Sequence, residues 1–268
     1  MTDLGELAER IECSAMESFY GAGPALGIPA VTARDGSVLA FCLEGSPDLM
    51  MNRAIGLGTA LPATREGVDT LLDWFRKRRA GRFLVHRTPS ARPAELQGWL
   101  TDAGLTPFRG WMKFARHRDR VIGPRTSLGV RRAGPELAGE FGRIACAAFG
   151  LPEGVSALAG ALCARERWHC FLSFDGQTPA GIGALYVDDG IGWLGFGATL
   201  PEFRGRGGQA AVVAARLEAA FDLGCTTVIT ETGEAVPGDP QHSYKNILKA
   251  GFHELYLREN FAGALAPA

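Results

Sequence analysis

The chain has 268 residues, of which 46% are hydrophobic and 21% are charged, and its formal net charge is −1. This balance is typical of a globular protein and provides no bulk attraction to nucleic acid or to a membrane surface. No apolar run approaches the roughly 18 residues of a membrane helix, and the polar, acidic N-terminus does not resemble a signal peptide. We therefore expect a cytoplasmic protein of one large or two small domains, without nucleic-acid or membrane partners.

The cysteines and histidines do not suggest a metal site. The six cysteines are scattered through apolar stretches without a CxxC pair, and the five histidines do not cluster with them. Free thiols in a reducing compartment, and no bound metal, are the expectation.

The first half of the chain alternates between helical and strand patterns. Hydrophobic spacing predicts helices at residues 3–20, 64–79 and 93–103, and strands at 31–34, 38–43, 52–58, 82–87 and 108–115. Thr64 is a suitable N-cap for the second helix. The basic run at 76–79 is interpreted as the solvated end of that helix rather than a nucleic-acid patch, since cations favour helix C-termini.

A polar, basic segment at 117–126 reads as a linker or an exposed strand end, after which the alternation resumes. Strands are predicted at 128–132, 168–174, 179–187, 191–199, 226–232 and 252–258. Helices are predicted at 135–149, 208–222 and 243–250, and a further short helix is predicted to follow the loop 150–154 and to end at about residue 164. The order of elements predicts an α/β fold with a mixed sheet flanked by helices.

The segment from Arg204 to Gly208 is rich in glycine and arginine and stands between a predicted strand and a predicted helix. Backbone amides at a helix N-terminus and two guanidinium groups suit a phosphate-binding turn. The segment lacks the Lys-Ser or Lys-Thr of a Walker A loop, and it fits the dinucleotide fingerprint poorly. An ordinary glycine-rich turn is the alternative.

The run Pro201-Glu-Phe-Arg-Gly-x-Gly207 resembles the acetyl-CoA pyrophosphate loop of the GNAT (GCN5-related) N-acetyltransferase superfamily. Arg204 and Gly207 match the family form, whereas Gln209 stands where glycine or alanine is usual. The later sequence Ser243 to Phe252 is similar to the family's last helix and its Lys-x-Gly-Phe ending. The resemblance covers about residues 127–262 and implies a bacterial acetyltransferase.

The first half follows the plan of the second, and a tandem pair of acyl-CoA N-acyltransferase-like domains is our interpretation. Residues 1–120 would form a degenerate GNAT-like domain, and 121–268 the acetyl-CoA-binding one. The segment 61–67, which replaces the glycine loop, contains one glycine and an acid, so it cannot cradle a pyrophosphate in the same way. The alternative is an unrelated α/β lobe.

The resemblance implies an acetyl-CoA cosubstrate and no metal. The loop would hold the pyrophosphate, the backbone at the end of the preceding strand would polarise the thioester carbonyl, and two polar residues of the last helix would contact pantetheine or ribose. The implied cofactor-binding residues are Gly197, Ala198, Thr199, Arg204, Gly205, Arg206, Gly207, Gly208, Gln209, Ser243 and Asn246.

A carboxylate must accept a proton from the attacking amine. Glu231, at the end of a predicted strand, is the first candidate, although a structural ion pair is an equal alternative. Glu234, Asp188 and Asp189 are weaker candidates on loops. The family's usual tyrosine acid is replaced by Ile247, so Tyr244 is proposed to act instead; Tyr256 is a second phenol, and a packing role is the alternative for both.

These observations predict an N-acetyltransferase that moves an acetyl group to the amine of a small or amino-acid-like molecule by direct attack in a ternary complex. A non-catalytic acyl-CoA-binding or sensing protein is the second interpretation, and a nucleotide-binding enzyme the third. The sequence does not identify the acceptor, and a monomer and a homodimer are both compatible with it.

Overall fold

The structure is a computed structural model that describes residues 4–265. The chain divides into two compact units. The first comprises the chain up to Lys113 together with the segment from Tyr256 onward, and the second comprises Phe114–Leu255. The second unit is therefore a continuous insertion within the sequence of the first.

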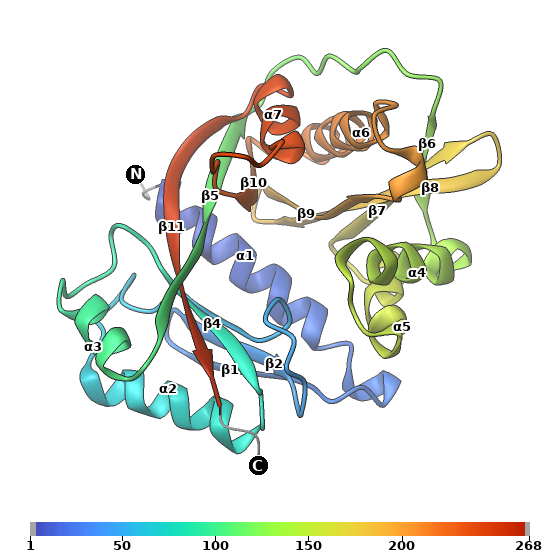
Figure 1. The fold of residues 1–268 in the computed structure, drawn as a ribbon. Helices are drawn as coiled ribbons and strands as arrows, with labels where there is room; N and C mark the ends of the chain where they lie inside the picture. Colours follow the sequence, from blue (N-terminus) through green and yellow to red (C-terminus); the bar gives the residue numbers. More distant parts are fainter. Residues whose placement is uncertain (1–3, 266–268) are drawn as a thin grey trace. The chain divides into compact units, whose positions relative to one another are not determined.

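The first unit begins with one long helix and continues as a sheet with two further helices (Figure 1). Its strand order is β1-β2-β3-β4-β11-β5, in which β3 and β4 are parallel and the pairs β1–β2, β2–β3 and β4–β11 are antiparallel. The elements are α1 (Leu4–Tyr20), β1 (Ala30–Asp35), β2 (Val38–Leu43), β3 (Arg53–Ile55), α2 (Arg65–Lys77), β4 (Arg82–Arg87), α3 (Leu96–Asp102), β5 (Thr106–His117) and β11 (His253–Ala264). Strands β5 and β11 contribute residues to both units.

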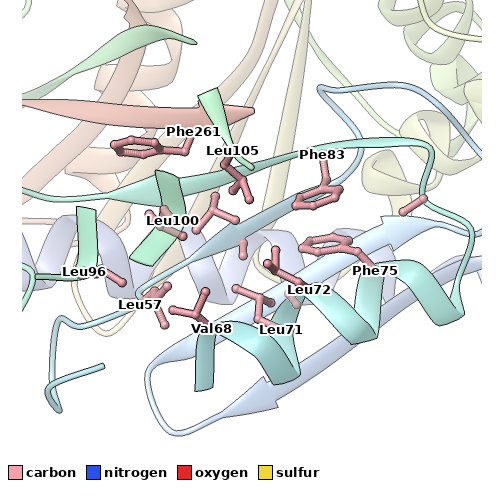
Figure 2. Close-up of a cluster of buried hydrophobic side chains, with 14 of the residues drawn as sticks. Leu57, Val68, Leu71, Leu72, Phe75, Phe83, Leu96, Leu100, Leu105 and Phe261 are labelled. Carbon is pink, nitrogen blue, oxygen red and sulfur yellow. The ribbon is translucent and has the colours of Figure 1, made fainter. Parts of the chain in front are cut away.

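Helix α2 supplies much of the hydrophobic core of this unit. Thr64 caps the helix by accepting a hydrogen bond from the Gly67 amide at 3.0 Å, as predicted. The apolar stripe of α2 then faces the sheet, where Phe75 stacks on Phe83 with ring centroids 4.3 Å apart (Figure 2). Phe261 of β11 belongs to the same cluster, so the end of the chain completes this core.

A buried cluster of charges fixes α1 within the same unit. Glu12 is fully buried and is paired with Lys113 of β5 and Arg258 of β11. Burial alone would raise the pKa of Glu12, but Arg258 and Lys113 together hold the pKa well below its usual range. Tyr256 donates to Glu9 of the same helix at 2.6 Å, so this phenol serves the ionic cluster of the first unit.

The second unit is a largely antiparallel sheet with helices on both faces. Its strand order is β5-β10-β9-β8-β7-β6, and β9 and β10 are parallel. Helices α6 and α7 lie on one side of the strands, and α4 and α5 lie on the other (Figure 1). The remaining elements are β6 (Gly129–Ala133), α4 (Ala138–Phe149), α5 (Ser156–Gly160), β7 (Trp168–Asp175), β8 (Thr178–Asp188), β9 (Ile191–Thr199), α6 (Gly208–Asp222), β10 (Thr227–Gly233) and α7 (His242–Lys249).

The mixed α/β class predicted from sequence is confirmed, and most helices and strands begin within a few residues of the expected positions. Four elements differ most: β3 is shorter than 52–58, α3 and α4 begin three residues after 93 and 135, and β11 continues past 258 to Ala264. The compact units divide at 113/114, near the predicted boundary at 120/121, and again at 255/256. The second division arises because Glu259–Ala264 pairs with β4 of the first unit.

Within residues 4–265, no helix combines the length and apolar character needed to cross a membrane. The six cysteines are all free, as expected, and five of them are buried.

Candidate active site

The parallel strands β9 and β10 pair over only part of their length. Their register ends where Leu194 lies opposite Thr230. There the Thr230 hydroxyl donates to the Leu194 carbonyl at 3.0 Å, occupying the acceptor that a continued ladder would use. Beyond this point, residues 195–199 of β9 and 231–233 of β10 have no mutual register. We call this opening between the two strands the split.

A β-bulge shapes the β9 side of the split. Phe196 and Gly197 together lie opposite the single residue Gly183 of β8, and Phe196 has a φ of +54°. A bulge re-aims the strand and increases its local twist. The bulge therefore bends β9 at the level where its pairing with β10 has ended.

The strand pattern after the bulge determines which amides face the split. The Leu200 amide donates to Ala180 of β8 at 2.9 Å. Because alternate residues of a strand direct their backbone groups to opposite edges, the amides of Thr199 and Gly197 face the split, whereas the amide of Ala198 faces β8. Two of the three backbone positions predicted from the family resemblance thus have amides on the open edge.

The predicted glycine loop joins β9 to α6. After a single turn at Pro201–Phe203, Gly205 and Gly207 take φ values of +76° and +83°, and α6 begins at Gly208. Such values favour glycine, since other residues adopt them at a cost. An added Cβ at Gly205 would meet no atom within 4 Å. The loop therefore offers open backbone at the positive end of a helix, as anion binding requires.

Both arginines of the loop have partners. Arg204 donates from Nε to the Thr199 carbonyl at 3.3 Å. Arg206 forms a two-point ion pair with Asp175, the last residue of β7, at 2.7 and 2.8 Å, and this hydrogen bonding lowers the pKa of Asp175. The Arg206 carbonyl accepts from the Thr126 hydroxyl at 2.6 Å. These contacts hold the loop from three sides.

Three residues predicted to bind the cofactor contact one another. The Gln209 side chain donates to the Ser243 hydroxyl at 3.1 Å and accepts from the Asn246 amide at 2.8 Å. Gln209 is in the first turn of α6, and the other two residues are in α7. The side chain that departs from the family pattern therefore connects the two helices that flank the loop.

Among the carboxylates proposed for proton transfer, Glu231 lies beside the split, whereas Asp188 and Asp189 do not. Glu231 is half-buried and is the first residue of β10 beyond its paired part. The side chain of Val228, in β10, lies on the face of the sheet that α6 covers, close to Ala220 of that helix. Because successive side chains of a strand alternate between faces, Glu231 lies on the opposite face, which α4 and α5 cover. Asp188 and Asp189 are near the other end of β9, because Asp188 lies opposite Ile191. Their place at that end argues against a role in acetyl transfer.

Tyr244 is held by a carboxylate in the second unit. Its hydroxyl donates to Glu254 at 2.6 Å, and its ring packs edge-on against Phe114. Burial and the hydrogen bond to Glu254 raise the pKa of Tyr244 to about 12. Ile247, at the family's usual tyrosine position, is buried. A phenol with this pKa remains protonated at neutral pH and releases its proton reluctantly.

The polar groups that face the split come from the backbone. The amides of Gly197 and Thr199 and the open loop at Gly205 together give a row of polar groups suited to an elongated ligand with an anionic end. The Oγ1 atom of Thr199, which has no hydrogen-bond partner among the described residues, lies instead over β8, where an added Cβ at Gly181 would be 3.2 Å from it. Among residues 4–265, no group of three or more His, Cys, Asp or Glu side chains could hold a metal ion.

The equivalent place in the first unit is filled by its own chain. Strands β3 and β4 are also parallel and flank a helix, and their register ends with Ala54 opposite Val85. Beyond it, the Arg92 amide donates to the Gly58 carbonyl at 2.8 Å, and the Ala63 amide donates to the Arg92 carbonyl at 2.7 Å. The backbone of Arg92 thus takes the position that remains open between β9 and β10.

The sequence interpretation missed Thr230, Thr126 and Arg216. Thr230 ends the β9–β10 ladder, and Thr126 fixes the loop from a segment read only as a linker. Arg216 donates to two strand carbonyls at the bulge. Its signal was present as a lone arginine in the apolar run 210–221, but only the structure identifies its partners.

Comparison with known proteins matches a family model to part of the second unit. The family model described as "Acetyltransferase (GNAT) family" matches residues 146–239. No curated protein matches the chain.

Solved structures match the chain over most or all of its length. A GCN5-related N-acetyltransferase from Kribbella flavida has a TM-score of 0.66 at 17% identity, covering 97% of this chain and 96% of that one. A GCN5-related N-acetyltransferase from Sphaerobacter thermophilus has a TM-score of 0.59 at 16% identity, covering 86% and 81%. A tandem GNAT protein from the clavulanic acid biosynthesis pathway has a TM-score of 0.58 at 14% identity, covering 100% and 97%. At these identities the matches establish the fold, with two GNAT-like halves.

Proposed function

We propose that this chain, whose residues 146–239 match the GNAT acetyltransferase family, transfers the acetyl group of acetyl-CoA to the amine of a small or amino-acid-like acceptor by direct attack in a ternary complex. The observation that carries this proposal is the split between β9 and β10, which leads directly into the glycine loop and the N-terminus of α6. One ligand with a diphosphate, an extended amide-containing arm and a thioester would satisfy the loop, the open strand edge and the bulge.

In this proposal, different groups of the chain bind the diphosphate and the acyl end of acetyl-CoA. When bound, acetyl-CoA supplies the activated acyl group. The amides of residues 205–209 and the N-terminus of α6 bind the diphosphate, and Arg204 or Arg206 adds charge when it exchanges its present partner. The amides of Gly197 and Thr199 donate to the groups that lie along the split, where developing negative charge is stabilised.

Glu231 is proposed to accept the proton of the attacking amine, directly or through a water molecule. Its position on β10, just beyond the last paired residue, supports this assignment. No nucleophile of the protein is required, because the amine attacks the thioester itself. The C–N bond forms as the C–S bond breaks, and CoA leaves as its thiolate, whose conjugate thiol has a modest pKa.

We also propose that each chain binds one acetyl-CoA, in the second unit. The support is the backbone of Arg92, which makes in the first unit the hydrogen bonds that a ligand would make in an open split. The first unit would thus retain the fold without the cofactor site, as its lack of a glycine loop at 61–67 also suggests.

A non-catalytic acyl-CoA-binding protein is the alternative that two observations favour. Ile247 replaces the family's usual tyrosine, and the Tyr244 phenol is held by Glu254 with a pKa of about 12. In that case the chain would bind acetyl-CoA tightly and release no CoA thiol with any of a broad panel of amines.

The test begins with thermal shift assays of the wild type, Arg204→Ala and Gly207→Glu with acetyl-CoA, CoA and ATP. A ligand that binds the folded state raises the melting temperature by mass action. We expect stabilisation of the wild type by CoA compounds and a reduced effect in both variants, followed by release of CoA thiol with an accepted amine. Equal stabilisation by ATP would favour a nucleotide-binding protein, and no effect of CoA compounds would remove the acetyltransferase assignment.

A further inference from the structure

Arg216 is a charged side chain on the buried side of α6, with only 3% of its surface exposed. Its Nη1 atom donates to the carbonyls of Ala184 in β8 and Gly195 in β9, each at 3.1 Å, and its Nε atom donates to Val212 one turn earlier at 3.2 Å. Ala184 and Gly195 are the last opposed residues before the register shift of the bulge. The guanidinium group therefore bridges the two strands where β9 bends.

Two glycines make room for this group. A Cβ added at Gly183 would lie 2.7 Å from Cζ of Arg216, and one added at Gly197 would lie 3.4 Å from Nη2. Both glycines belong to the bulge, one on each strand. The guanidinium group thus fills the space between α6 and the bulge, and the bulge and the arginine fit as one structural unit.

Within residues 4–265, no carboxylate forms an ion pair with the buried Arg216 guanidinium group. Its hydrogen bonds are accepted by main-chain carbonyls. Burial lowers the pKa of Arg216 to about 10, so the group remains positively charged at neutral pH. Removing a charge from water is costly, and an apolar side chain of similar volume would often stabilise such a site better. The position therefore suggests a role beyond stability.

We infer that Arg216 is a positioning residue for acetyl transfer, because its guanidinium group fixes the β9 bulge and so directs the amides of Gly197 and Thr199 into the split. Its positive charge also lies behind the strand edge on which negative charge develops during attack on the thioester. This inference rests on the proposed function, since it assigns the bulge to the acyl end of the ligand.

The experiment changes the two partners of the contact in turn, first Arg216 and then the glycine of the bulge against which its guanidinium group packs. Arg216→Met removes the donors and the charge while keeping a long side chain, and Arg216→Lys keeps the charge without the planar fork. Gly183→Ala leaves Arg216 in the chain but displaces its Cζ atom from the sheet. Val213→Ala is the control, because Val213 is buried in the same helix and its truncation reports the general cost of a packing defect in α6.

The first measurement uses acetyl-CoA labelled with carbon-13 at the carbonyl and needs no acceptor. We expect the carbonyl resonance to shift when acetyl-CoA binds to the wild type and to Val213→Ala. In Arg216→Met and Gly183→Ala the bound resonance should lie nearer the free position, with Arg216→Lys between them. With an accepted amine, kcat should fall by about tenfold to a hundredfold in Arg216→Met, as for misdirected catalytic donors, while KM for acetyl-CoA changes by less than roughly threefold.

The outcomes separate the inference from the function on which it rests. If wild type does not bind acetyl-CoA, the proposed function fails and takes this inference with it. If wild type binds with a shifted carbonyl resonance, and Arg216→Met and Gly183→Ala bind with the same resonance and the same kcat, the inference is overturned while the proposed function stands. A lower melting temperature in these variants, with the carbonyl resonance and kcat unchanged, would show that Arg216 contributes to stability only.

Discussion

The glycine loop can be tested by adding one negative charge without changing its shape. Gly205 has a φ of +76°, and a side chain there would meet no atom within 4 Å. Asparagine and aspartate both tolerate this left-handed conformation and have nearly the same volume. Gly205→Asn and Gly205→Asp should therefore have similar melting temperatures, and any difference between them in ligand affinity isolates the charge.

The size of that difference follows from the position of the loop in solvent. Residue 205 is exposed, so two unit charges about 4 Å apart interact by about 1 kcal/mol in water. A diphosphate carries two such charges near the loop, which gives about 1–2 kcal/mol of repulsion. We therefore expect acetyl-CoA to bind Gly205→Asp about 5- to 30-fold more weakly than Gly205→Asn at low salt. The gap should narrow as salt is added.

The assay is isothermal titration calorimetry with acetyl-CoA at two salt concentrations. The control is Gly224→Asp, which adds the same charge at a residue with φ of +88° and equal free space. It follows the other end of α6, about 22 Å away along the helix. Equal affinity of the Asn and Asp variants at low salt would refute the assignment of this loop to the diphosphate.

Three further outcomes are expected. The double-mutant cycle of Gln209→Ala and Asn246→Ala, followed by chemical denaturation, should give a coupling energy of about 1 kcal/mol for their 2.8 Å hydrogen bond; additive effects would contradict the contact. Asp175→Asn releases Arg206 from its exposed ion pair, so acetyl-CoA should bind a few-fold more tightly; weaker binding would argue against recruitment of Arg206. Burial lowers the pKa of His86 in the folded state, so the unfolded state takes up a proton first as the pH is lowered. The free energy of unfolding therefore decreases once the pH is below about 6.5. The loss is about 1.4 kcal/mol at pH 5.5. His86→Gln should lack this loss in melting curves at pH 7.5 and 5.5.

Local signals in the sequence were sufficient to predict most helices and strands of the second unit. A strand, a proline, a glycine-rich turn and an apolar helix occur in the order that the structure has, because each depends on residues that are neighbours in the chain. The cap at Thr64 was predictable for the same reason, since its partner is only three residues away.

What could not be predicted depends on residues that are distant in sequence. The Tyr244 phenol was a candidate acid, but its carboxylate partner Glu254 is on a strand that begins after α7. The bulge in β9 required knowing that Gly183 lies opposite it. The continuation of β11 was missed because Asn260, Phe261 and the small residues after them have no clear alternation, and they are strand residues because they pair with β4.

The pairing of β4 with the last strand has a consequence for synthesis of the chain on the ribosome. Residues 114–255 are contiguous, so the second unit can fold while translation continues. Most core residues of the first unit are translated before the second unit. One edge of β4, however, receives its partner strand only when residues 259–264 emerge from the ribosome. Until then that edge has unpaired backbone groups of the kind that attract other strands. Between translation of Arg87 and the emergence of residues 259–264, this edge of β4 is therefore exposed to aggregation.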